Sequence, residues 1–317
     1  MLEVKLKKLI SSGYLVKLDY PLSDLTTFKI GSQAQAAGYL AVSSFNQVVK
    51  ILKVVTEEDI PYKIIAGGSN LVLADKLLPY LFIHWQSIEG IEVDGNRIFC
   101  SAGVSLKDLV AESLEVGLGG LETLSGIPGS VGGAVVGNAG AYGQSISDHL
   151  TAVTFFDGYQ LLRLEKKECN FSYRHSLFKK NQGVVLAAEF QLTPVDKNKL
   201  QEISREIIVK REAKYPPGLL CPGSFYKNWP VADLPKEFQL PADKIIVGKL
   251  PAGWVLEEVG AKGLTVGGVK VADYHGNLII NKGQGTFADV KALDKELRQR
   301  VKKRFGLELE PEIRYIE

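Results

Sequence analysis

Three short segments of the chain carry side chains that could hold or protonate an organic anion. Arg174 lies in Tyr-Arg-His-Ser, and a guanidinium can bind a carboxylate through two parallel hydrogen bonds. Ser224 follows a glycine in Gly-Ser-Phe-Tyr-Lys-Asn, where it could act as a nucleophile or a proton donor. Glu312 follows Pro311, which favours an extended path and would place Glu312 and Arg314 on one face. Each segment also has an ordinary explanation: a surface arginine on a strand edge, a serine in a turn, and solvated charges near a terminus.

The stretch 121–143 could form an anion-binding loop. It holds seven glycines among 23 residues, and glycine lets successive backbone N–H groups form a concave nest for a phosphate. A flexible linker is the alternative, but linkers are polar, whereas this stretch interleaves apolar residues such as Val131 and Val135. A second candidate loop is Gly67-Gly-Ser-Asn70, which an ordinary turn would explain equally well.

Composition indicates an ordinary globular protein. The 317 residues exceed one comfortable core, and the net charge of +2 gives no reason to expect binding to nucleic acid or a membrane surface. No apolar run is long enough to span a bilayer, so we expect no membrane insertion. The three cysteines and four histidines lack the spacing of a metal site, so we expect no metal, reduced thiols and a cytoplasmic location.

The elements that must position these residues alternate between helices and hairpins. Amphipathic spacing and capping residues predict helices over 44–59, 105–116, 197–214 and 286–306. Two Asp-Gly turns predict hairpins of strands over 88–93 and 97–102, and over 151–156 and 159–164. Further strands are predicted over 62–66 and 184–192. This mixture indicates an α+β protein, and neither a Rossmann nor a Walker fingerprint is present.

Ten of these segments, taken in order, resemble the UDP-N-acetylenolpyruvylglucosamine reductase family. The resemblance extends over nearly the whole chain: 25–31, 66–71, 127–133, 138–143, 173–174, 223–228, 252–254, 262–263, 281–283 and 311–314. It implies an FAD-binding domain of the vanillyl-alcohol-oxidase (PCMH) type and a smaller α+β substrate-binding domain. FAD would be the cofactor, with NADPH and UDP-N-acetylglucosamine enolpyruvate as substrates.

The resemblance also implies roles for individual residues. Arg174 and Glu312 would polarise the substrate carboxylate, while Ser224 would donate a proton to C2. For these roles Glu312 needs a proton or a water, and Ser224 needs a neighbour such as Lys227. The expected FAD-binding residues are Ala66, Gly67, Gly68, Ser69, Asn70, Leu71, Gly126, Ile127, Pro128, Gly129, Ser130, Gly132, Gly133, Asn138, Gly140 and Ala141. The expected substrate-binding residues are Tyr142, Tyr173, Lys227, Asn228 and Glu258.

Some features depart from the family pattern. Glu258 stands where many relatives have Gln, and Trp229 replaces the usual Pro after Lys-Asn. The short spacing between Arg174 and Ser224 favours the branch that lacks a tyrosine-bearing lid. We expect a monomer with an FAD-binding subdomain over 1–84 joined by the tail 308–317, a second over 85–200, and a substrate-binding domain over 201–307.

Two other functions fit part of the pattern. A flavoenzyme of the same fold that oxidises hydroxy acids or sugars would need a different substrate half. A non-catalytic nucleotide-sugar binder would be expected to lack the residues that the resemblance places in the reaction. Both Gly-Ser-Phe-Tyr-Lys-Asn and Pro-Glu-Ile-Arg favour the reductase.

Overall fold

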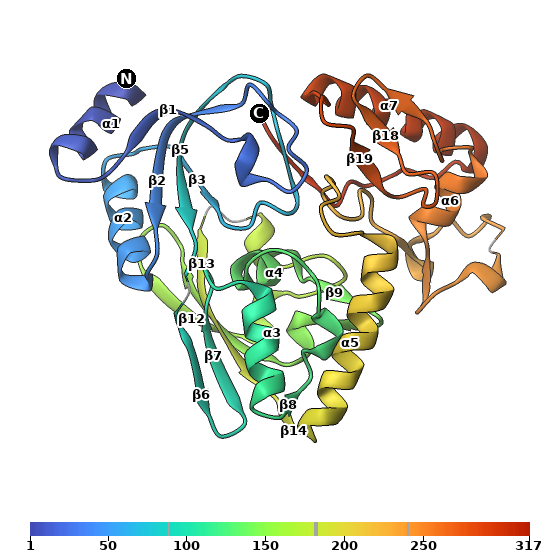
Figure 1. The fold of residues 1–317 in the computed structure, drawn as a ribbon, viewed down its shortest axis with the longest axis horizontal. Helices are drawn as coiled ribbons and strands as arrows, with labels where there is room; N and C mark the ends of the chain where they lie inside the picture. Colours follow the sequence, from blue (N-terminus) through green and yellow to red (C-terminus); the bar gives the residue numbers. More distant parts are fainter. Residues whose placement is uncertain (88, 181–182, 240) are drawn as a thin grey trace. The chain divides into compact units, whose positions relative to one another are not determined.

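The computed structural model describes residues 1–87, 89–180, 183–239 and 241–317. Contacts within the chain divide it into two units (Figure 1). The first unit comprises 1–20, 36–67 and 79–213, and the second comprises 21–35, 68–78 and 214–317. The start of one predicted strand, Ile88, lies outside the described residues.

A four-stranded sheet and two helices form one part of the first unit. The strand order is β1-β2-β5-β3, with β1 at Lys17–Pro21, β2 at Gln35–Val42, β5 at Leu77–Trp85 and β3 at Tyr62–Ile65. The helices are α1 (Leu2–Ser11) and α2 (Phe45–Glu57). The Ser44 side chain accepts a hydrogen bond from the Gln47 amide, which confirms the predicted start of α2. Strand β3 runs directly into Ala66 and Gly67, so the sheet fixes the start of the first candidate loop.

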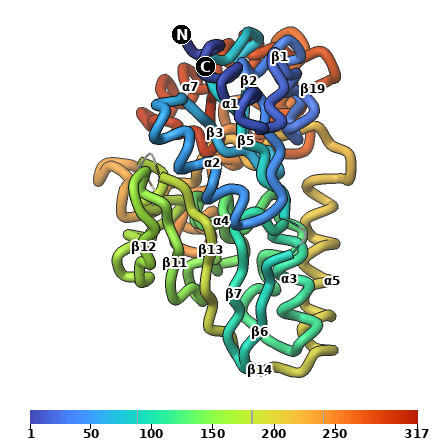
Figure 2. Tube along the Cα trace, turned by 90° about the vertical axis from the view of Figure 1, so that its left-hand side faces the viewer, coloured from blue at the N-terminus to red at the C-terminus, as the bar shows by residue number. Residues whose placement is uncertain are grey.

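An antiparallel five-stranded sheet forms the other part. Figure 2 shows its order, β12-β11-β13-β7-β6. The strands are β6 (Ile91–Asp94), β7 (Arg97–Ser101), β11 (Leu150–Phe156), β12 (Leu161–Glu165) and β13 (Val184–Gln191). Gly95 and Gly158 take positive φ values of 58° and 108° in the two connecting turns. The predicted Asp-Gly turns are therefore confirmed, because only a residue without Cβ adopts this conformation readily.

Helices α3 (Leu106–Glu115), α4 (Val131–Gly137) and α5 (Lys197–Lys214) also belong to the first unit, and α4 packs against β13 and β7. Two-residue strand pairs join β8 (Leu118–Gly119) to β14 (Thr193–Pro194) and β9 (Gly140–Ala141) to β10 (Gln144–Ser145). The sequence predicted α3 and α5 but not α4, because three of the seven residues of α4 are glycines and glycine weakens helices.

The second unit has its own core, which includes Phe225, Tyr226 and one face of α7 (Phe287–Phe305). Thr286 and Asp289 form the predicted capping box of α7, and Gly306 ends the helix with φ 70°. A parallel pair joins β4 (Leu71–Leu73) to the C-terminal β20 (Arg314–Ile316). The remaining elements are α6 (Ala252–Glu258), the pair β15 (Trp229–Pro230) and β16 (Lys249–Leu250), and the sheet β17 (Thr265–Val266), β18 (Val269–Val271) and β19 (Ile279–Asn281).

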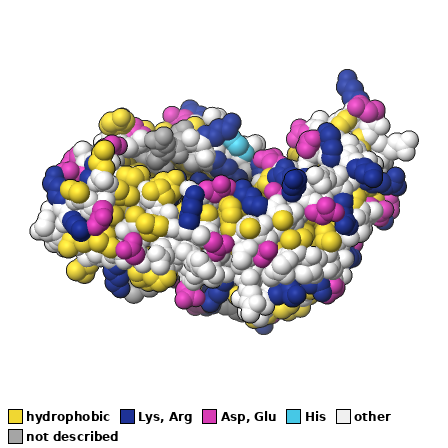
Figure 3. All heavy atoms as spheres, turned by 90° about the horizontal axis from the view of Figure 1, so that it is seen from above, with side chains coloured by type: hydrophobic (Ala, Val, Ile, Leu, Met, Phe, Trp, Pro, Cys, Tyr) yellow, Lys and Arg dark blue, Asp and Glu magenta, His cyan; other side chains and the backbone are white. Residues whose placement is uncertain are grey.

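These helices and largely antiparallel sheets confirm the α+β class. Within the described ranges, no helix combines the length and apolar composition that crossing a bilayer requires. Basic and acidic side chains are interspersed on the face seen in Figure 3. This mixture agrees with the small net charge of +2.

Candidate active site

The two glycine-rich segments meet in the first unit. A Cβ built on Gly67 would lie 2.9 Å from the Cα of Gly129, closer than real Cβ contacts allow. Gly126 and Gly129 have φ values of +73° and +115°, which L side chains rarely adopt. The Ser130 hydroxyl accepts a hydrogen bond from the Gly133 amide at 3.2 Å and caps α4. Glycine is therefore required here for the close approach of two backbone segments.

The glycines of α4 lie on two faces of the helix, one packed inside the unit and one open. A Cβ on Gly132 would meet the Cβ of Ala102 at 2.8 Å, so this glycine permits close packing inside the unit. A Cβ on Gly133 would contact only Ser130 Oγ, at an ordinary 3.5 Å, and one on Gly137 would meet nothing within 4 Å. Gly133 and Gly137 are four residues apart and share one face of the helix. This face presents bare backbone, against which a flat or anionic group can pack closely.

The second candidate loop is divided between the units. Ala66 and Gly67 belong to the first unit, whereas residues 68–71 belong to the second. A Cβ on Gly68 would lie 1.8 Å from the Leu25 carbonyl oxygen, and Gly68 has φ +57°. The Asn70 side chain donates to the Glu312 carbonyl oxygen at 3.0 Å. Within the second unit, Asn70 thus fastens this loop to the segment that carries Glu312.

Arg174 lies beside the end of the glycine-rich stretch in the first unit. Its Nη2 donates to the Gly140 carbonyl oxygen at 2.7 Å, and its Nη1 lies 3.5 Å from the Asn138 carbonyl oxygen. Asn138 ends α4 in a left-handed conformation and donates to the Ser172 carbonyl oxygen at 2.8 Å. Arg174 itself has φ 53°, an uncommon conformation for a residue with a side chain. The structure therefore brings the segments around 138–140 and 172–174 together.

The two tyrosines predicted to bind substrate flank this arrangement. The Tyr173 ring centroid lies 5.5 Å from the Arg174 guanidinium carbon. Tyr142 directly follows the short strand β9, has φ 52° and is 50% exposed. A partly exposed aromatic ring such as that of Tyr173, beside the Arg174 cation, can bind a ligand that has both flat and anionic parts.

Ser224 begins a segment that is hydrogen-bonded on both sides in the second unit. On one side the Phe225 amide donates to the Asn277 carbonyl oxygen at 3.1 Å, and Ser224 forms a β-bridge with Leu278. On the other side the Glu312 amide donates to the Phe225 carbonyl oxygen at 2.8 Å. Ser224 and Glu312 are distant in sequence, but backbone hydrogen bonds hold them on adjacent segments.

Ser224 has a side-chain partner that the sequence analysis did not identify. Its Oγ lies 2.9 Å from the hydroxyl oxygen of Tyr215. Tyr215 precedes Pro216-Pro217-Gly218, and the sequence analysis assigned no role to this segment. No local signal connects Tyr215 to Ser224, because their contact depends on the loop that joins them.

A buried network supports the segment from the side of α7. The Tyr226 hydroxyl donates to Asp294 Oδ1 at 2.7 Å, and Arg298 Nε donates to the same oxygen at 2.8 Å. Burial, reinforced by the Asp294 charge, raises the pKa of Tyr226 well above its usual value. Tyr226 therefore stays protonated and remains a hydrogen-bond donor.

Three further predicted residues lie in the second unit with other partners. Lys227 was expected to assist Ser224. In the structure its ammonium group forms an ion pair with Glu310. Asn228 Oδ1 accepts from the Ala252 amide at 3.0 Å, at the start of α6. Glu258 is exposed at the last residue of the same helix.

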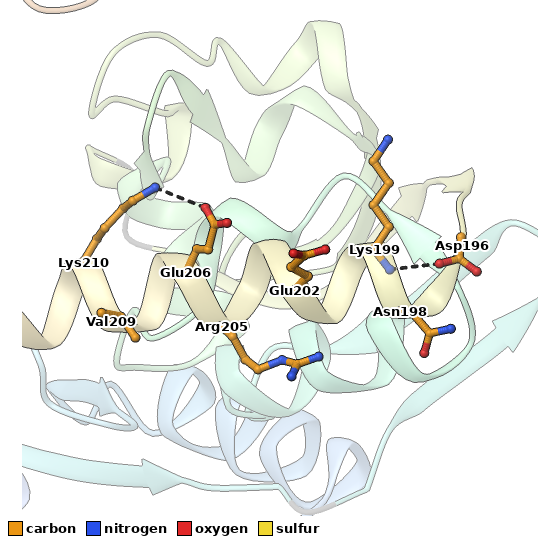
Figure 4. Close-up of a pocket in the computed structure, with 8 residues that line it drawn as sticks. All are labelled: Asp196, Asn198, Lys199, Glu202, Arg205, Glu206, Val209 and Lys210. Carbon is orange, nitrogen blue, oxygen red and sulfur yellow. Dashed lines mark hydrogen bonds and ion pairs between the residues drawn. The ribbon is translucent and has the colours of Figure 1, made fainter.

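A surface pocket on the outer face of α5 does not contain the predicted residues (Figure 4). Its charged residues balance, three acidic and three basic: Asp196, Glu202, Glu206, Lys199, Arg205 and Lys210. Lys210 pairs with Glu206 at 3.4 Å. Such a face is typical of a solvated helix. Among the described residues, no group of three or more His, Cys, Asp and Glu is placed to hold a metal ion.

Comparison with known proteins identifies both parts of the chain. Residues 36–159 match the family described as "FAD binding domain", and residues 216–316 match "UDP-N-acetylenolpyruvoylglucosamine reductase, C-terminal domain". The chain is 38% identical to the UDP-N-acetylenolpyruvoylglucosamine reductase of Solibacter usitatus, over 95% of this chain and 96% of that protein. It is 36% identical to the reductase of Carboxydothermus hydrogenoformans, over 97% and 95%.

A solved structure agrees with these sequence relatives. The crystal structure of UDP-N-acetylenolpyruvylglucosamine reductase from Thermus caldophilus matches with a TM-score of 0.73 and 30% identity, covering 96% of this chain and 99% of that one. This agreement confirms the expected FAD-binding fold with a smaller second domain. The protein is an FAD-dependent oxidoreductase, and the chain belongs to the UDP-N-acetylenolpyruvoylglucosamine reductase family.

Proposed function

We propose that this protein reduces UDP-N-acetylglucosamine enolpyruvate to UDP-N-acetylmuramate, with NADPH as the electron source and FAD as the carrier, in peptidoglycan precursor synthesis. The observation that carries the proposal is the pairing of segments 224–226 and 310–312. It holds Ser224 and Glu312, the expected proton donor and carboxylate-polarising residue, on adjacent segments of one unit.

The glycine-rich segments fit FAD. The close approach of Gly67 and Gly129 and the bare face of α4 at Gly133 and Gly137 offer backbone without side chains, as a pyrophosphate or a flat ring requires. We assign FAD binding to all the residues between Ala66 and Ala141 that were expected from the sequence. When bound, FAD would supply the hydride that adds to C3 of the enolpyruvyl group.

Arg174 would bind the substrate carboxylate. Hydride addition to the enol ether leaves negative charge that the adjacent carboxylate can share, and a fixed cation stabilises that charge more than the ground state. Hydrogen bonds to the Gly140 and Asn138 carbonyl oxygens hold the guanidinium in place before substrate arrives. Preorganisation of this kind avoids the cost of orienting the charge during the reaction.

Ser224 would donate the proton that completes the reduction at C2. Glu312 would contact the carboxylate in a protonated state or through a water, because two carboxylates would otherwise repel each other. Tyr142, Tyr173, Lys227, Asn228 and Glu258 would contact other parts of the sugar nucleotide. We further propose the three-part division expected from the sequence (1–84 with 308–317, 85–200, and 201–307) and a monomeric state.

An anaerobic flavin titration tests the proposal. The absorbance near 450 nm is recorded on purified protein, then after NADPH, then after UDP-N-acetylglucosamine enolpyruvate. Bleaching by NADPH followed by recovery with the enolpyruvyl sugar nucleotide is the expected result. Bleaching without recovery would reject the substrate, and a colourless protein that FAD cannot reconstitute would reject the whole proposal.

A further inference from the structure

The hydroxyl groups of Tyr215 and Ser224 form a hydrogen bond of 2.9 Å within the second unit. The Tyr215 ring packs against a small buried cluster formed by Cys221, Ala272 and Leu278. The Lys214 ammonium lies 5.0 Å from the ring centroid. The phenol is therefore held at Ser224 by contacts on its ring as well as by the hydrogen bond.

The direction of this hydrogen bond decides what Ser224 can do. A serine hydroxyl has one proton, and if Ser224 donates it to Tyr215, the proton points away from any other acceptor. If Tyr215 donates instead, the Ser224 proton is left for a second partner. Resting on the proposed function, we propose that Tyr215 is the hydrogen-bond donor to Ser224 and restores the proton that Ser224 gives to the substrate.

The proton balance is complete with these two groups and water. As the C2–H bond forms, the Ser224 O–H bond breaks and its electron pair stays on Oγ. The Tyr215 O–H bond then breaks, its proton passes to Ser224 Oγ, and the phenolate regains a proton from water, which leaves a hydroxide that the buffered solvent neutralises. The transfer is downhill because a phenol is a stronger acid than an aliphatic alcohol. Tyr215 is only partly buried, so water can reach its side chain.

A double-mutant cycle on the flavin-loaded protein tests this role. Tyr215→Phe removes one oxygen and keeps the ring packing. We expect bleaching by NADPH at the parental rate and reoxidation by the enolpyruvyl substrate slowed about tenfold, the rate equivalent of one hydrogen bond. In a Ser224→Ala background the same change should have no further effect, because Tyr215 acts through Ser224. Full additivity of the two losses would overturn the inference.

A solvent isotope effect separates proton delivery from a purely structural role. Slower proton delivery should raise the D₂O effect on reoxidation in Tyr215→Phe above that of the parent protein. Tyr159→Phe is the control, since Tyr159 is 89% exposed in a turn of the first unit and should leave all rates unchanged. An unchanged isotope effect in Tyr215→Phe would also overturn the inference.

The reoxidation rate of the parent protein separates a failure of this inference from a failure of the proposed function. If the parent is not reoxidised by the enolpyruvyl sugar nucleotide, the proposed function fails and the role of Tyr215 fails with it. If the parent is reoxidised but Tyr215→Phe matches it in rate and isotope effect, only the role of Tyr215 is rejected.

Discussion

The side chain of Asn277 binds both polar groups of the Tyr226 backbone. Its Nδ2 donates to the Tyr226 carbonyl oxygen and its Oδ1 accepts from the Tyr226 amide, both at 2.8 Å. Asn277 is 3% exposed and Tyr226 is 1% exposed, so water cannot replace either bond. One buried amide therefore fixes Tyr226 within the segment that begins at Ser224, which pairs on its other side with the segment carrying Glu312.

Loss of this amide should weaken the second unit substantially. Asn277→Ala leaves a buried N–H and a buried C=O without their partner, and we expect a loss of about 2–4 kcal/mol in the free energy of unfolding. Asn198→Ala, on the exposed face of α5, should stay within about 0.5 kcal/mol of the parent protein. Urea unfolding measures both, and equal midpoints for the two variants would contradict the assigned role of Asn277.

Ser224→Ala should separate the two half-reactions. NADPH should still bleach the flavin, because Ser224 has no proposed role in that step, while reoxidation by the enolpyruvyl substrate should slow by about 10²–10⁴. Stopped-flow absorbance near 450 nm follows both. Ser11→Ala, exposed at the end of α1, should reoxidise at the parental rate. Reoxidation of Ser224→Ala at that rate would show that another group donates the proton.

Helices that begin with a capping residue could be predicted, because the capping signal lies within a few residues of the sequence. Ser44, Ser105 and Thr286 begin helices where their side chains accept the expected backbone hydrogen bonds. The helix α4 was missed because glycine does not favour helices, and packing against β13 and β7 supports it instead.

The candidate site was only partly predictable, because several of its contacts join residues that are distant in the sequence. Resemblance to a family predicted roles for Ser224 and Glu312, but the contact of Ser224 with Tyr215 required the folded loop between them. The hydrogen bonds from Asn277 to Tyr226 connect residues 51 positions apart. Neither Tyr215 nor Asn277 belongs to a local sequence pattern that would reveal its contact, since tyrosine before proline and asparagine after glycine are both ordinary in turns.

His275 should make the stability of the protein depend on pH below neutrality. Its Nδ1 accepts from the Asn277 amide at 3.0 Å, so the folded state requires the neutral ring. Burial, with a further contribution from Lys214, lowers the pKa of His275 from 6.5 to about 4. Between these values the unfolded chain binds a proton that the folded chain does not, so the free energy of unfolding falls as pH decreases.

The comparison variant is His275→Gln, which cannot titrate. The stability advantage of the parent over this variant should be complete above pH ~6.5 and shrink as pH falls toward ~4. Urea midpoints at several pH values in this range measure it. Parallel curves for the two proteins would show that His275 does not have the depressed pKa.

The outward face of α4 yields a prediction in which stability and cofactor affinity change in opposite directions. Gly133→Ala places a methyl group where only Ser130 Oγ is near, at 3.5 Å, on an exposed position of a helix. Replacement of a helical glycine by alanine should stabilise the FAD-free protein by about 0.5–1 kcal/mol. If FAD packs against this bare backbone, the same methyl group should weaken FAD binding, as measured by flavin retention on ultrafiltration. Gly132→Ala is the matched control, because its methyl group would meet Ala102 at 2.8 Å and should destabilise the protein even without FAD. A Gly133→Ala protein that is more stable and retains FAD like the parent would place the cofactor elsewhere.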